Sequence, residues 1–299
     1  MSIVQLIDEM DECGVLGAGR LARATGLMTE MFGDEEYTNF LSLAGPMVPG
    51  GLRNIIGLLI DRKFVDAIVT SGANVVHDII EALGYRGIVG YHGADDVVLR
   101  SQGLGRAGDI FFEQEGFEAL EKKAYQVFEG LPEEKKREIA FSELMAEIGK
   151  GLSDDESILK KAALHNVPIF SPGLMDSVLG MHIWTYSQLK PLRVNPVLDI
   201  SKMADMVFEA KKIGCIILGG GLPKHHVLGA SILREGVDAA VQITLDRPEG
   251  GSLSGAPLEE SISWKKAQIE SRLATVVGDA TVVLPLMVAA VLERLEERK

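Results

Sequence analysis

The sequence predicts an α/β fold, a doubly wound and mostly parallel sheet with helical insertions in a single domain. Three observations lead to this fold class: short, nearly all-apolar runs, helix-like segments that alternate with them, and Gly-, Ser- or Asp-containing turns after the runs. Strands that are buried on both faces read as continuous apolar runs, and their alternation with helices is typical of a parallel sheet. A hydrophobic content of 46% with 24% charged residues is that of a core-forming chain and excludes disorder.

In chain order, the strand candidates are residues 67–70, 167–170, 215–218, 239–244 and 274–277. The clearest helix-like segments are residues 52–63, 74–83, 200–212, 227–234 and 284–297. Residues 1–40, and the run on to Leu43, are expected to form a helical N-terminal extension. Residues 95–155 have the least sheet character, and the charged stretch 117–151 is expected to be helical with a solvated face. Nothing resembles a linker, so residues 1–299 are expected to form one domain.

Charge and cysteine content limit the classes of function. A net charge of −13 argues against a nucleic-acid surface and suits cationic partners. Cys13 and Cys215 are too few for a disulfide framework or a structural zinc site, and no metal is expected. The longest uncharged run lies between Asp279 and Glu293, which is shorter than the roughly 20 residues that span a bilayer. With no recognisable secretory signal, we expect a cytoplasmic protein without a membrane partner.

The turns after the strands are the first places to look for a site, because ligands of a doubly wound sheet bind beyond the carboxyl ends of its strands. Gly219, Gly220 and Gly221 follow an apolar run and precede a helix-like segment. They could bring a ligand close to the backbone or simply make a tight turn. Residues 103–108 match G-x-G-x-x-G, but an extended run follows them instead of a helix, so we interpret that match as coincidence.

Two histidines and a lysine beside a tryptophan are the candidates for chemistry. His225 and His226 do not share a helical face and have no cysteine or carboxylate cluster, so acid–base work is favoured over metal binding. Lys266 stands next to an aromatic ring in Trp264-Lys265-Lys266, and a desolvated amine there could attack an imine or carbonyl carbon. The alternative is an amphipathic helix with a solvated lysine pair, which the pattern alone favours.

Taken together, these segments resemble the deoxyhypusine synthase family, and the short N-terminus resembles its archaeal or bacterial members. The similarity runs from about residue 40 to the C-terminus and is most specific in the last third. The matching motifs are Gly219-Gly220-Gly221-x-x-Lys224-His225-His226, Ser254-Gly255-Ala256 followed by Glu260 and Ser263-Trp264-x-Lys266, Asp279-Ala280, Ser171-Pro172-x-Leu174-x-Asp176, Leu198-Asp199-Ile200, and Leu99-Arg100 with Arg106-x-Gly108.

The resemblance implies a Rossmann-like fold, NAD as cofactor and a homotetramer with active sites at subunit interfaces. It also implies a reaction in which spermidine is oxidised beside its secondary amine, with NAD as the hydride acceptor. The aminobutyl group then moves to an enzyme lysine as an imine, releasing 1,3-diaminopropane, and passes to one lysine of the translation-factor-five-A precursor. Reduction of that last imine gives deoxyhypusine.

The same resemblance assigns residues by position. Lys266 falls on the imine-forming lysine, and His225 falls on the histidine that handles the proton at the secondary amine. Trp264 and Glu260 fall on positions that flank and bind the polyamine. His77 stands where eukaryotic members carry a glutamate and is expected to bind substrate. The positions implied for NAD are Ser71, Gly72, Ala73, Asp176, Gly220, Asp279 and Ala280.

Several acidic positions of the eukaryotic members are apolar in this chain, namely Val76, Met181 and Leu253. A carboxylate that pairs with an ammonium in a protected site contributes about 1.5–3 kcal/mol. Spermidine would therefore be held less strongly unless Glu249, Glu259 or Asp246 substitutes. The identities of the amine that donates the aminobutyl group and of its acceptor therefore stay open. The alternatives are aminobutyl transfer to a small amine such as putrescine, giving homospermidine, and an NAD-binding homologue that has lost turnover.

Overall fold

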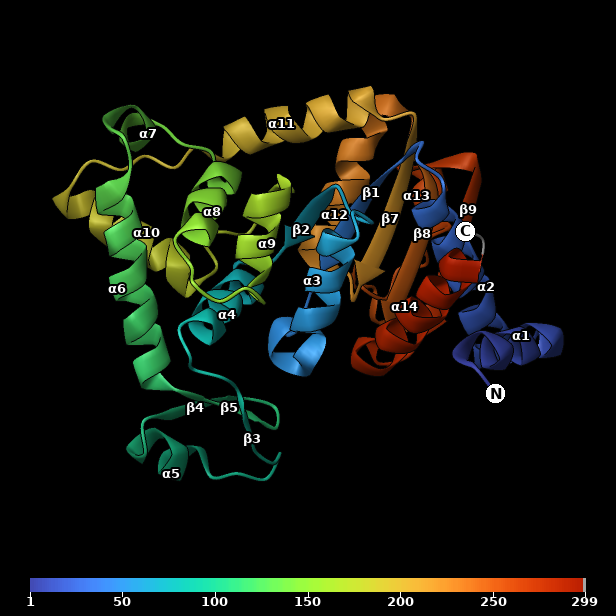
Figure 1. The fold of residues 1–299 in the computed structure, drawn as a ribbon, viewed down its shortest axis with the longest axis horizontal. Helices are drawn as coiled ribbons and strands as arrows, with labels where there is room; N and C mark the ends of the chain where they lie inside the picture. Colours follow the sequence, from blue (N-terminus) through green and yellow to red (C-terminus); the bar gives the residue numbers. More distant parts are fainter. Residues whose placement is uncertain (298–299) are drawn as a thin grey trace. The chain divides into compact units, whose positions relative to one another are not determined.

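The computed structural model describes residues 1–297, and the fold is α/β with a mainly parallel sheet, as predicted (Figure 1). The main sheet has six strands in the order β6-β2-β1-β7-β8-β9, and a smaller sheet has the order β3-β5-β4. The strands are β1 (Tyr37–Leu43), β2 (Ala67–Thr70), β3 (Ile88–Val89), β4 (Leu104–Ala107), β5 (Ile110–Glu113), β6 (Ile169–Phe170), β7 (Lys212–Leu218), β8 (Val237–Thr244) and β9 (Ala267–Val277). The α-helices are α1 (Ile3–Cys13), α2 (Leu16–Gly33), α3 (Arg53–Asp61), α4 (Gly72–Ala82), α5 (Asp96–Ser101), α6 (Gln114–Gly130), α7 (Glu133–Arg137), α8 (Phe141–Lys150), α9 (Ile158–His165), α10 (Val178–Leu189), α11 (Pro196–Glu209), α12 (Gly221–Ser231), α13 (Glu260–Ser263) and α14 (Ala280–Glu297).

The chain divides into two compact units. The first comprises residues 1–45, 63–69 and 200 onward, and the second comprises residues 46–62 and 70–199. That all of residues 1–299 fold as one domain stays a prediction. None of the helices within residues 1–297 is both long and apolar enough to cross a bilayer.

In the first unit, β1, β7, β8 and β9 form a parallel ladder. Nearly every residue of β7 and β8 is buried. The apolar runs in the sequence predicted this burial, because they are typical of strands that are covered on both faces. Helices α2 and α14 pack on β8, α2 also packs on β9, and α12 packs on β1 and β7. The parallel register brings the carboxyl ends of three strands, at Leu218, Thr244 and Val277, to one edge of the sheet.

The N-terminal prediction is right for two helices and wrong for the strand after them. Residues 37–43, expected to be helical, form the buried strand β1 beside β7, so the helical extension over residues 1–40 ends at Gly33. Asn39 and Ser42 made this run look polar, yet both are buried. The side-chain amide of Asn39 donates through Nδ2 to the carbonyl of Met31 at 3.0 Å. This bond satisfies the side-chain donor inside the core.

The other predicted elements are present, with different limits. Strand β2 spans residues 67–70 as predicted. Strand β9 begins at Ala267, seven residues before the predicted start, because after Ala267 its first half is half-buried or exposed and contains polar residues instead of being uniformly apolar. The G-x-G-x-x-G stretch forms β4 and a turn, and the extended run after it is β5, so no nucleotide-binding helix follows it.

In the second unit, a buried carboxylate ties three helices together. Asp78 on α4 is fully buried and accepts hydrogen bonds from Arg53 Nε at 2.6 Å and from Ser157 Oγ at 2.8 Å. It also accepts from the backbone amides of Ile158 and Leu159, at 3.0 and 2.9 Å. These two amides belong to the first turn of α9, where helix amides lack intrahelical partners. Asp78 therefore both pairs Arg53 and caps α9.

Candidate active site

A glycine turn opens the candidate site at the carboxyl end of β7. Gly219 and Gly221 have φ angles of +73° and +54°, in the left-handed region that favours glycine. A Cβ on Gly220 would stand 2.4 Å from the Cα of Ser254, so the turn lies directly against the 252–256 loop. This confirms that the three glycines make a tight strand-to-helix turn. Helix α12 begins at Gly221 without a side-chain cap.

Lys266, His225 and Trp264 come together from segments far apart in the chain. The Nζ of Lys266 lies 3.4 Å from Nδ1 of His225 and 5.6 Å from the centre of the Trp264 ring. The distance to His225 allows proton exchange after a small side-chain movement. The distance to the Trp264 ring lies within the range of cation–π attraction. The cluster therefore places an amine, an acid–base group and an aromatic face at one point.

The backbone around Lys266 is fixed by its neighbours. The carbonyl of Lys266 accepts hydrogen bonds from Ser231 Oγ and from the amide of Val237, both at 3.0 Å. Its own amide donates to the carbonyl of Ser261 at 2.8 Å, at the end of α13. Lys265, the residue before it, has a φ of +57°. The turn from α13 into β9 thus points the Lys266 side chain toward α12, and the predicted amphipathic helix through the lysine pair is not formed.

A small cavity of about 70 Å³ lies beside this cluster. Lys224, His225, Glu260, Trp264 and Lys266 all line it. Trp264 is 67% exposed, so within one chain its indole covers only one side of the Lys266 amine. Glu260, at the start of α13, supplies the carboxylate of the cavity wall.

Sequence reasoning missed the role of Lys224 and Gln242, which are both buried. The Nζ of Lys224 donates to Oε1 of Gln242 at 2.9 Å and to the carbonyl of Ala256 at 2.7 Å. Gln242 in turn donates to the carbonyls of Gly219 and Ser254, at 2.8 and 2.9 Å. Gln242 stands between the apolar residues Val241 and Ile243 of β8, and this position was the signal that could have identified Gln242.

Burial lowers the pKa of Lys224 to about 8, because an ammonium is poorly solvated there. Glu260 and Glu259 act in the opposite direction, and the charge of Lys266 adds to the lowering. Burial also lowers the pKa of His226, and His225 beside it contributes to that shift. His226 therefore favours its neutral form.

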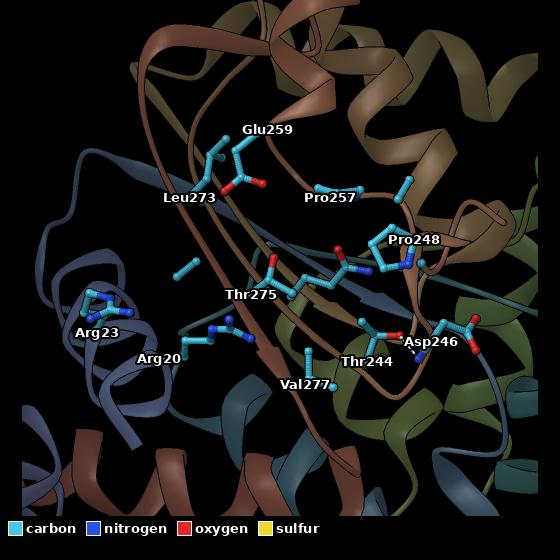
Figure 2. Close-up of a pocket in the computed structure, with 14 residues that line it drawn as sticks. Arg20, Arg23, Thr244, Asp246, Pro248, Pro257, Glu259, Leu273, Thr275 and Val277 are labelled. Carbon is cyan, nitrogen blue, oxygen red and sulfur yellow. Dashed lines mark hydrogen bonds between the residues drawn. The ribbon is translucent and has the colours of Figure 1, made fainter. Parts of the chain in front are cut away.

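A larger cavity of about 510 Å³ shares Ala256 and Pro257 with the small one (Figure 2). Figure 2 shows Arg20 and Arg23 on α2 near Thr275 and Val277 of β9. The remaining wall comes from the end of β8 and the loop after it, which contribute Gln242, Thr244, Asp246, Pro248, Gly255, Ala256, Pro257 and Glu259, and from Leu273 and Ala274. Of the residues in the sequence motifs, Gly255 and Ala256 line this cavity.

Asp279 and Ala280 start α14 after β9. Oδ1 of Asp279 accepts hydrogen bonds from the amide and the hydroxyl of Thr281, both at 2.8 Å, while its side chain stays exposed. Ala280 is buried. The carboxylate therefore caps α14 and keeps its second oxygen free of any hydrogen bond within residues 1–297. Their assignment to NAD stays a prediction.

In the second unit, the turn after β2 meets the segment that holds Asp176. A Cβ on Gly72 would stand 2.5 Å from the Cβ of Ser177, so the Ser71–Ala73 turn and residues 174–177 are in direct contact. Ser177 caps α10 through a 3.1 Å hydrogen bond from the amide of Gly180. Asp176 is exposed beside this contact. The structure thus brings together four of the residues predicted to hold NAD.

His77 lies in the same unit, in aromatic surroundings. Its ring centre is 4.5 Å from that of Phe112 and 6.3 Å from that of Phe117. Burial lowers the pKa of His77, so the neutral ring is favoured. A neutral imidazole can exchange hydrogen bonds with an amine but cannot replace the charge of a glutamate. Its role as a substrate ligand stays a prediction.

The three apolar substitutions have different surroundings. Val76 is buried in α4, whereas Met181 and Leu253 are 62% and 47% exposed. Leu253 lines the small cavity next to Lys266. Within residues 1–297, no group of three or more His, Cys, Asp or Glu side chains is arranged to hold a metal ion.

The fold and the site define a class: an α/β enzyme whose candidate nucleophilic lysine stands beside a histidine and a glycine turn at the carboxyl edge of a parallel sheet. The family model described as "Deoxyhypusine synthase" matches residues 5–291. The "Probable deoxyhypusine synthase" of Methanothermobacter thermautotrophicus is 50% identical over 99% of this chain and 95% of its own length. That of Methanopyrus kandleri is 44% identical over 99% and 95% of the two chains.

The chain therefore belongs to the deoxyhypusine synthase family. It is an enzyme of the transferase class. A crystal structure from Entamoeba histolytica, described as that of a candidate deoxyhypusine synthase, covers 95% of this chain and 92% of its own, with a TM-score of 0.67 at 23% identity. This likeness confirms the predicted fold.

Proposed function

We propose that this enzyme transfers the aminobutyl group of spermidine to one lysine of the translation-factor-five-A precursor, with NAD as cofactor and an imine on Lys266 as intermediate. The observation that carries the proposal is the 3.4 Å approach of Lys266 Nζ to His225 Nδ1, beside Trp264 and Glu260. This is the arrangement that an attacking amine, its proton acceptor and a bound polyamine require.

The residues present fit a dinucleotide. Helices α4 and α12 both start at glycine-containing turns after strands, and neither has a side-chain cap. Their first-turn amides are therefore available to a diphosphate. Within the second unit, the residues that we propose for NAD binding are Ser71, Gly72, Ala73 and Asp176. Within the first unit, they are Gly220, Asp279 and Ala280. When bound, NAD supplies the hydride acceptor for the amine oxidation and the hydride donor for the final reduction.

The chain's own residues carry the transfer steps. His225 takes the proton from the secondary amine of the substrate as the imine forms. Unprotonated Lys266 then attacks the imine carbon, the bond from that carbon to the departing nitrogen breaks, and 1,3-diaminopropane leaves with the proton. The indole face of Trp264 attracts the cationic chain, and Glu260 pairs with an ammonium end. The acceptor lysine next attacks the same carbon and frees Lys266.

Location and assembly belong to the same proposal. We place the enzyme in the cytoplasm as a homotetramer, where a partner subunit would cover the exposed face of Trp264. Size measurement by light scattering tests the assembly. A monomer would contradict it.

The apolar positions favour a second candidate, transfer to a small amine such as putrescine. Leu253 lines the small cavity and offers no charge to an ammonium, and Val76 is too deeply buried to reach one. Incubation with spermidine, NAD and putrescine, without a protein acceptor, would then yield homospermidine. Product formation only with the protein acceptor would reject this candidate.

The decisive experiment follows labelled spermidine in the presence of NAD. We expect borohydride to trap the label on Lys266 and, when the factor precursor is added, transfer of the label to one lysine of the precursor. Lys266→Arg should abolish both signals, because a guanidinium stays protonated and cannot attack. Lys265→Arg, the same change at the adjacent and exposed lysine, should retain them. Trapping at another residue, or no trapping in the native enzyme, would refute the proposal.

A further inference from the structure

Lys224 is a buried amine in the candidate site that the proposed chemistry leaves without a task. It is 4% exposed, and it lines the same cavity as Lys266. Its two hydrogen-bond acceptors, Gln242 Oε1 and the Ala256 carbonyl, are both neutral. No carboxylate in the described part of the chain forms an ion pair with it. A buried lysine without a counter-ion is rare, since its desolvation is not compensated.

The hydrogen-bond geometry of Lys224 suits an uncharged amine. A neutral –NH2 group has two N–H donors, which match the two acceptors within 2.9 Å. An ammonium carries a third N–H, for which residues 1–297 provide no acceptor. Burial has the largest effect on its charge, and the charged groups that act on it are Glu260 in α13, Glu259 just before that helix, and Lys266. His225 and His226 are the titratable residues next to it on α12.

These contacts connect three parts of the site. Lys224 precedes His225 in the first turns of α12, and its amine reaches Gln242 on β8 and Ala256 in the loop. Gln242 holds Gly219 and Ser254 on either side. The bridge therefore holds the residue before His225 against both β8 and the loop.

We propose that Lys224 is a positioning residue that acts through His225: its buried amine ties the start of α12 to β8 and to the 254–256 loop, and so holds the His225 ring beside Lys266. This inference rests on the proposed role of Lys266 as nucleophile. Because the amine of Lys224 changes its charge near pH 8, the strength of this bridge changes within the working range of an enzyme.

The first test measures the rate of borohydride trapping on Lys266 between about pH 7 and 9.5, a range above the ordinary histidine pKa of about 6.5 and below the ordinary lysine pKa of about 10.4. The native enzyme should show an inflection near pH 8. Lys224→Met and Lys224→Arg should lose it, because neither side chain titrates there, and Lys224→Met should trap about 10–100-fold more slowly with an unchanged KM. Lys202→Met, at an exposed lysine of α11, is the matched control and should behave as native.

A second test needs no enzymatic turnover. Acetic anhydride labels free amines, and mass spectrometry gives the reactivity of Lys266 relative to Lys202 at each pH. A reactivity profile of Lys266 that is altered in both Lys224 variants supports the bridge. Identical profiles in the native enzyme and both variants would overturn it. If native enzyme traps no spermidine at all, the proposed function fails, while the labelling profile still decides the role of Lys224.

Discussion

Arg53 in the second unit and Lys224 in the first are both almost completely buried, at 5% and 4% exposure, but their surroundings differ. Arg53 pairs with Asp78 at 2.6 Å and with Asp154 at 2.8 Å. Lys224 has only neutral partners. The charges of Asp78 and Asp154 raise the pKa of Arg53, even though burial opposes that shift. For Lys224, burial lowers the pKa to about 8.

The difference separates a structural charge from a functional one. Asp78 also satisfies Ser157 and two amides of α9, so the Arg53 charge belongs to a closed network whose removal would leave buried groups without partners. Lys224 lines a cavity and is free to change its protonation state without breaking an ion pair. Perturbed amines of this kind concentrate at sites of chemistry.

The largest effect is expected at Asp78. Asp78→Asn removes the nearest carboxylate of Arg53, leaving Asp154 at 2.8 Å and Glu81 at 3.9 Å, and it weakens the cap of α9. The free energy of unfolding should therefore fall by about 3 kcal/mol or more. Asp155→Asn makes the same change in an exposed pair with Lys160, 2.6 Å apart, and should cost less than about 1 kcal/mol. Urea unfolding measures both. Equal decreases in the free energy of unfolding for the two variants would show that the buried network of Asp78 contributes no more stability than an exposed ion pair.

The next effect is a pH dependence of stability that Lys224 alone should cause. The unfolded chain keeps this proton up to its ordinary pKa of 10.5, whereas the folded protein releases it near 8. Because the unfolded state then binds more protons, stability should rise as pH increases from 8 to 10.5, by at most about 3 kcal/mol.

Lys224→Met lacks this contribution and isolates it. We compare the free energy of unfolding of the variant with that of the native protein. The value for the variant minus the value for the native protein should be greatest at pH 7. It should decline above pH 8, because the native protein gains stability once Lys224 is neutral. Urea unfolding of both proteins at pH 7, 8, 9 and 9.5 provides the comparison. A constant difference over this range would mean that the buried amine does not titrate near 8.

The same contrast explains what the sequence could predict. Mostly apolar runs located β2, β7 and β8, because strands covered on both faces are rich in apolar residues, and Gln242 alone did not hide the run in β8. Strand β1 was missed, since Asn39 and Ser42 stand inside it and are buried. Only tertiary contacts, such as the bond from Asn39 to Met31, make such a strand stable.

The candidate site shows the same limit. The motifs identified Lys266, His225 and Trp264, and the structure places them together. Lys224 belongs to the same motif, but its burial depends on Gln242 in another strand and on the Ala256 carbonyl. Spacing along the chain carries no information on such long-range burial, so the charge state of Lys224 required the folded structure.

The smallest effects are expected at two glycines, Gly220 in the turn before α12 and Gly229 in α12 itself. Comparing them tests whether the turn next to Lys224 depends on its tight backbone contact with the 252–256 loop. Gly220→Ala forces a Cβ to within 2.4 Å of the Ser254 Cα and should cost about 1–3 kcal/mol, because backbone must shift. The displaced loop carries Ala256, so the inflection near pH 8 should also weaken. Gly229→Ala, in the last turn of α12 with open space around it, should instead raise stability by up to about 1 kcal/mol. Thermal unfolding gives both values, and a stabilising Gly220→Ala would mean that the turn does not press against the loop.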